Sequence, residues 1–61
     1  MQLHIRDPAF TDRLVAFLRS VGQDPVVRDP ATIDVDLTPE EVEVYLRVWS
    51  VMHPGATVEP A

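Results

Sequence analysis

The sequence predicts a two-layer α+β domain, in which antiparallel strands pack against two helices. Apolar residues alternate with polar ones in residues 1–6 and 32–37, recur at helical spacing in residues 10–21, and follow a helix start at Thr38. Alternation indicates strands that are buried on one face, and recurrence every three or four residues indicates amphipathic helices. The 61 residues form one small domain without room for a second core.

The first half of the chain predicts a strand followed by a helix. In residues 1–6 every second side chain is apolar, as in a half-buried strand. Asp7 is a suitable N-cap, and Pro8 fits the first helical turn, where its missing N–H is harmless. Gly22 fits the left-handed position that closes a helix. The apolar positions of this helix are Phe10, Leu14, Phe17, Leu18 and Val21.

The middle of the chain predicts a β-hairpin. Residues 26–28 and 32–37 have the composition of strands, and the turn between them contains Asp29-Pro30-Ala31, in which proline fixes one backbone angle. In the second strand Ile33, Val35 and Leu37 fall on one face and are expected to point inward.

A second helix and a short last strand complete the chain. Thr38 as N-cap, with Glu41 three residues later, forms the pattern of a capping box. The helix is expected to end near Met52 or His53, because the following Pro54 disfavours helical geometry before it. Residues 56–59 are long enough for one more strand.

The resulting order, β-α-β-β-α with a last β, resembles the ferredoxin-like sandwich. That resemblance implies a split βαβ arrangement, in which the third strand lies between the first and the second. It also implies an antiparallel sheet with both helices on one face, which right-handed crossovers favour over the mirror topology.

Composition restricts the classes of partner. The formal charge is −5, because the chain has ten acidic residues and only five arginines. It has no lysine and no cysteine. An acidic domain repels nucleic-acid phosphates and anionic membranes, so neither is an expected partner. Residues 1–8 lack a signal-peptide pattern, and no apolar run approaches the roughly 20 residues of a membrane span. We therefore expect a soluble, cytoplasmic protein.

The second helix carries two apolar stripes. Tyr45, Trp49 and His53 are spaced four residues apart and lie on one side. This stripe is most often core, facing the sheet; the alternative is a small-ligand pocket near Trp49 and His53. The same core side is expected to include Val42, Leu46 and Met52.

The other stripe consists of Val44, Val48 and Val51. The two stripes together cover roughly 220° of the helix, more than the roughly 100° that a simple surface helix needs. The valines are therefore expected to pack against the first helix or against a second copy of the chain, as a homodimer interface.

The outward face of the sheet carries the only metal candidates. If the first and third strands are antiparallel neighbours, His4 lies near Asp34 and Asp36, which are ligand types for a divalent metal. The alternative is a solvated ladder of cross-strand charges, and an arginine at position 6 would compete with a metal.

Catalytic motifs are absent from the sequence. Neither Ser20 nor Ser50 lies in a Gly-x-Ser-x-Gly turn, and two glycines do not make a phosphate-binding loop. We expect a homodimeric interaction or regulatory domain without catalysis and without a cofactor. A small-ligand sensor or small enzyme, and a divalent-metal protein, are the alternatives.

Two further resemblances are visible. Ile5-Arg6-Asp7-Pro8 with the apolar helix after it looks like the first βα unit of ACT regulatory domains. Those domains bind amino acids at dimer interfaces through a glycine after the proline; this chain has Ala9 there, so the resemblance implies topology alone. The segments LHIRDP and YLRVWSVMHPG are similar to short α/β proteins of actinobacterial type, a likeness that implies no particular activity.

Overall fold

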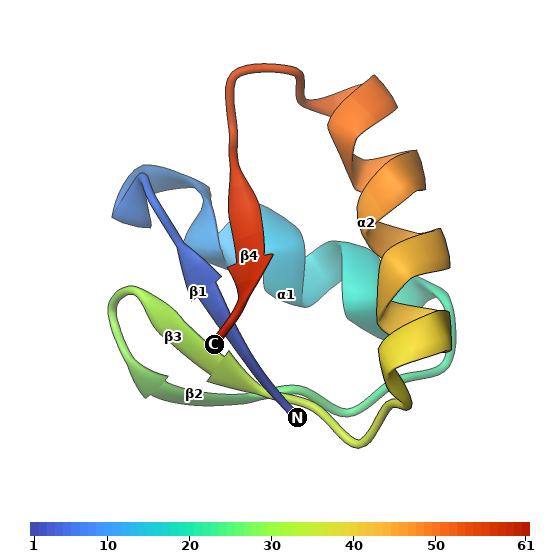
Figure 1. The fold of residues 1–61 in the computed structure, drawn as a ribbon. Coiled ribbons are helices and arrows are strands. Elements are labelled where there is room, and N and C mark those ends of the chain that lie inside the picture. The colour runs from blue at the N-terminus through green and yellow to red at the C-terminus, as the bar shows by residue number, and fades with distance from the viewer.

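A computed structural model describes all 61 residues and contains a four-stranded sheet and two α-helices (Figure 1). The elements are β1 (Gln2–Ile5), the 3-10 turn η1 (Pro8–Phe10), α1 (Thr11–Ser20), β2 (Val26–Asp29), β3 (Thr32–Asp34), α2 (Pro39–Met52) and β4 (Val58–Pro60). The strand order is β2-β3-β1-β4, and every neighbouring pair is antiparallel. The predicted α+β class is confirmed. Neither helix is long and apolar enough to cross a membrane.

The two faces of the sheet differ in burial. In β1, Leu3 and Ile5 are buried, whereas the alternate residues Gln2 and His4 are exposed. This is the alternation that the sequence predicts for a half-buried strand. One core cluster joins the buried face to side chains of both helices: Leu3, Ile5, Leu14, Phe17, Leu18, Ile33, Val35, Leu37, Val42, Trp49 and Ala56.

Local signals define both ends of α1. The Asp7 carboxylate accepts a hydrogen bond from the backbone N–H of Ala9 at 3.0 Å, as expected of an N-cap. The cap begins a 3-10 turn, however, and the α-helix starts only at Thr11. At the other end Gly22 has a φ of +86°, and two backbone bonds close the helix, from Gly22 to the Arg19 carbonyl and from Gln23 to the Leu18 carbonyl. This pair of bonds is a Schellman motif.

The capping box of α2 forms as predicted. The Thr38 hydroxyl accepts from the backbone N–H of Glu41 at 3.3 Å, and the Glu41 carboxylate accepts from the N–H of Thr38 at 3.2 Å. Two of the otherwise unpaired donors at the helix start are thereby satisfied. The helix ends at Met52, in agreement with the stop expected before Pro54.

The third strand is shorter than predicted, because it ends at Asp34 rather than at Leu37. The backbone N–H of Leu37 bonds to the carbonyl of Val35 at 3.0 Å, and such a three-residue turn bends the chain out of the sheet. Val35 and Leu37 are nevertheless buried, as their inward orientation requires. The alternating pattern therefore predicts burial here but not the end of the strand.

The last strand lies at one edge of the sheet and includes a proline. Residues 56–59 are predicted for it, and the structure places it at Val58–Pro60, paired with β1. The Thr57 carbonyl accepts from the N–H of Arg6, just after β1, and the N–H of Ala61 donates to the Gln2 carbonyl. The backbone groups of the alternate residues Val58 and Pro60 therefore point to the free edge. Pro60 has no N–H to offer a further strand.

Candidate functional site

Four apolar side chains on α2 are exposed to solvent. The exposed fractions are 58% for Val44, 47% for Val48, 80% for Val51 and 55% for Met52. At about 100° per residue they lie within one arc of roughly 100°. We call these four residues the exposed stripe. The helix forms an outer boundary of the molecule (Figure 1).

The exposure of the stripe bears on one alternative and corrects one assignment. Val44, Val48 and Val51 were expected to pack against the first helix or a second copy, and in the single chain all three are exposed and none belongs to the core cluster. The assignment of Met52 to the core side of α2 is wrong. Leu46 and Met52 each lie about 60° from Trp49, on opposite sides, and Leu46 packs against the core whereas Met52 is 55% exposed. The buried face of α2 is therefore turned toward Leu46 and away from Met52.

Trp49, in the aromatic stripe, is a core residue. Its side chain is 1% exposed, and its indole N–H donates to the carbonyl of Ala56 at 2.8 Å. The ring centroid lies 5.7 Å from that of Phe17 on α1, within the range of stabilising aromatic pairs. Trp49 thus joins α2 both to α1 and to the segment that leads into β4. Tyr45 is half-buried and packs against the same core.

His53 extends this aromatic packing toward the surface. Its ring centroid lies 4.3 Å from that of Trp49 and 6.1 Å from that of Phe10. The Arg13 guanidinium lies over the Phe10 ring, 5.0 Å from its centroid, in cation–π geometry. These aromatic and cationic groups therefore pack against one another. The structure contains one surface groove, and none of the three predicted pocket residues, Tyr45, Trp49 and His53, lines it.

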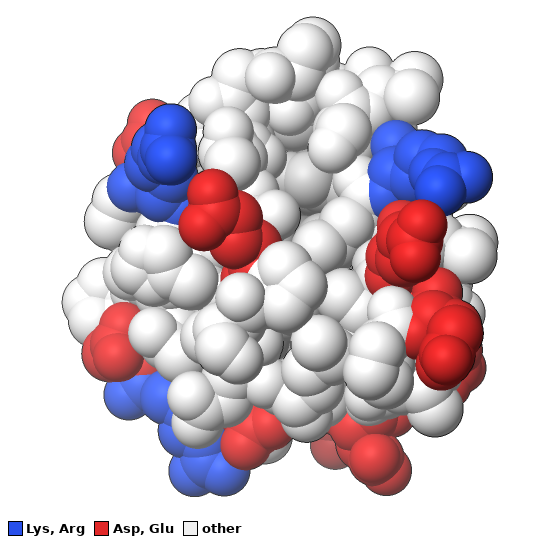
Figure 2. Space-filling view, viewed as in Figure 1, with Lys and Arg blue, Asp and Glu red and all other residues white.

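The groove lies between α2 and the ends of β1 and β4. Its volume is about 440 Å³, within the usual range for ligand pockets, although it is broadly open to solvent. Figure 2 shows uncharged atoms over the middle of this face and charged groups toward its margins. At the rim, Arg47 donates to Glu43 at 2.9 Å. The lining residues are Met1, Pro39, Val42, Glu43, Leu46, Arg47, Ser50 and Pro60.

The sequence did not indicate this groove. Two of its eight lining residues, Met1 and Pro60, lie at opposite ends of the chain and meet beside α2. Their proximity depends on the pairing of β1 with β4, in which Pro60 is opposite Leu3. No local pattern specifies that register.

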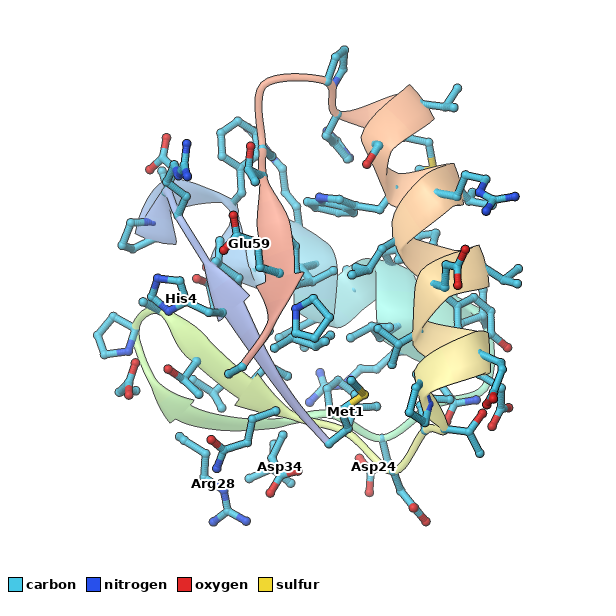
Figure 3. The ribbon with its side chains drawn as sticks, in the orientation of Figure 1. Met1, His4, Asp24, Arg28, Asp34 and Glu59 are labelled. Carbon is cyan, nitrogen blue, oxygen red and sulfur yellow. The ribbon has the colours of Figure 1, made fainter.

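The proposed metal residues are not brought together. His4 pairs with Thr32 of β3 and Glu59 of β4, whereas Asp34 pairs with Gln2 (Figure 3). Asp36 lies beyond the end of β3. The structure contains no group of three His, Cys, Asp or Glu side chains placed to hold a metal ion.

Asp34 is held by two cationic groups instead. Arg28 donates to its carboxylate at 3.0 Å, and the amino group of Met1 lies 3.5 Å from the other carboxylate oxygen. The hydrogen bond from Arg28, followed by the contact with the Met1 amino group, lowers the pKa of Asp34 despite some desolvation. This carboxylate therefore takes part in ion pairs that link β2, β3 and the start of β1.

No protein-family model matches this chain, and comparisons with curated proteins and with solved structures give no significant match. The likenesses to ACT domains and to actinobacterial-type proteins stay predictions. A functional proposal must come from the surfaces of the molecule itself.

Proposed function

We propose that this chain is a small ferredoxin-like interaction domain that forms a homodimer through the exposed stripe of α2. The strand order β2-β3-β1-β4 supports the fold assignment, because it inserts the third strand between the first two. The buried residues of β1 and β3 share one core with α1 and α2, which supports placing both helices on one face.

The observation that carries the dimer is the exposed stripe. Val44, Val48, Val51 and Met52 together expose on the order of 400 Å², a patch of the size that often marks an interaction site. That is roughly a tenth of the 3845 Å² surface of the molecule. A 61-residue chain without cysteines has few other means of reinforcing a small core, and association is one of them.

The edges of the sheet favour the helix as the contact. Association by strand pairing needs a free edge with available backbone groups. At β4 that edge contains Pro60, and at β2 the register is interrupted between Val27 and Asp29. Prolines and such irregularities are devices that discourage strand addition.

Sedimentation velocity over a concentration series tests the proposal. We expect a monomer–dimer equilibrium with a micromolar dissociation constant, because interfaces below about 1,200 Å² in total belong to weak complexes. Val48→Glu should give a monomer with an unchanged circular dichroism spectrum, since the Val48 side chain is exposed in the single chain and is not part of the core cluster. A wild-type chain that stays monomeric at high concentration would refute the dimer.

Ser50→Glu provides the matched control. Ser50 is exposed on the same helix but outside the stripe, so it adds the same charge without entering the contact. Dissociation by both variants would point to a general effect of negative charge. Unfolding by Val48→Glu at all concentrations would show that Val48 serves the single chain instead.

A further inference from the structure

We infer that the two copies meet through antiparallel α2 helices, with the two-fold axis close to Val48. This inference rests on the proposed homodimer and specifies its geometry. In an isologous dimer the same patch of both copies is used, and the patch must be complementary to itself.

The spacing of the stripe fits this requirement. Val44 precedes Val48 by four residues, and Met52 follows it by four. When the two helices are antiparallel and the two-fold axis passes near Val48, the Val44 side chain of each copy lies opposite the partner's Met52. Two apolar pairs and a central valine contact result, without a polar side chain in the row.

Charge favours the same orientation over the parallel one. Glu40 and Glu41 lie in the first turn of α2, and its last turn contains no basic residue. A parallel pair would bring four carboxylates together at one end, where like charges repel. An antiparallel pair separates the two acidic ends by the length of a 14-residue helix, about 21 Å. It also opposes the two helix dipoles.

Arg47 does not prevent this contact. It adjoins Val48 in the sequence, so the arginines of the two copies come near the two-fold axis. Each guanidinium is already bonded to its own Glu43 at 2.9 Å, which compensates the charge within each copy. The stripe alone supplies about half of the roughly 800 Å² per partner in a standard interface, which fits the weak complex proposed above.

Single-cysteine variants test the orientation directly, because the native chain has no cysteine. Under mild oxidation, Val48→Cys should form a disulfide-linked homodimer. Val44→Cys should not link to itself, since two such residues lie about 12 Å apart along antiparallel axes, and a disulfide requires Cα atoms within about 7 Å. A mixture of Val44→Cys and Met52→Cys should yield the mixed dimer. Glu59→Cys, on the sheet, measures random collision.

The outcomes separate this inference from the proposed function. Efficient self-linking of both Val44→Cys and Met52→Cys would indicate parallel helices and overturn the inference. Linking of all three variants no faster than Glu59→Cys, with a dimeric wild type in sedimentation, would show that the dimer uses another face. A monomeric wild type would overturn both.

Discussion

The two sides of α2 are both apolar, yet the fold treats them in opposite ways. Val42 is 1% exposed, whereas Val51 on the other side is 80% exposed. Residue type therefore does not decide burial on this helix; the direction in which each side chain points does. The core side holds the monomer together, and we assign the exposed stripe to contact between copies. Substitutions on the two sides should accordingly act on different equilibria.

The largest effect is expected on the core side. Trp49→Ala should destabilise the fold by about 3–5 kcal/mol, because it empties the space between α2 and α1 and leaves the Ala56 carbonyl without its donor. That loss exceeds the stability of a few kcal/mol typical of so small a domain, so circular dichroism should show an unfolded chain. A cooperative thermal transition near the wild-type temperature would contradict the core role of Trp49.

Val44→Ala is the counterpart on the exposed side. Measured at dilutions where the monomer dominates, it should change stability by no more than about 0.5 kcal/mol. At higher concentration it should weaken the dimer.

An intermediate effect is expected at the N-cap of α2, because the helix that it stabilises carries both the core side and the exposed stripe. Thr38→Ala removes the acceptor for the Glu41 N–H and should cost about 1 kcal/mol in urea denaturation. Thr38→Ser retains a hydroxyl and should behave like the wild type. Equal losses in the two variants would mean that the hydroxyl is not the stabilising group.

The sequence predicted best where the determinants are local. The caps at Asp7 and Thr38 and the left-handed Gly22 involve neighbours within a few residues, so their patterns are read directly. The end of β3 and the partners of His4 depend on strand register, which arises from contacts between distant segments. The exposure of Met52 depends on where the helix axis lies relative to the sheet. A helical wheel gives relative angles but not that orientation.

The smallest effect is expected at Asp34, on the sheet and away from both sides of α2. Its pKa is lowered in the folded state, so its contribution to stability is present above the unfolded-state pKa of roughly 4. That contribution is lost as the pH falls through the folded-state pKa. Arg28→Ala removes the main cause of the shift and should make the melting temperature fall less steeply between neutral and acid pH.

Arg6→Ala is the control for this pH series. It removes another exposed arginine, whose contact with Glu59 is longer at 3.6 Å. An identical acid dependence in the wild type and in Arg28→Ala would exclude the ion pair as its source.

The position of the single tryptophan has a practical consequence. The indole of Trp49 is enclosed by the core and is 1% exposed, whereas the side chains of the exposed stripe project into solvent. Its fluorescence should therefore change when the chain unfolds and stay constant when two folded copies meet. Emission spectra would follow folding, and hydrodynamic measurements on the same sample would follow association. The chain thus carries a native optical reporter that distinguishes loss of structure from loss of a partner.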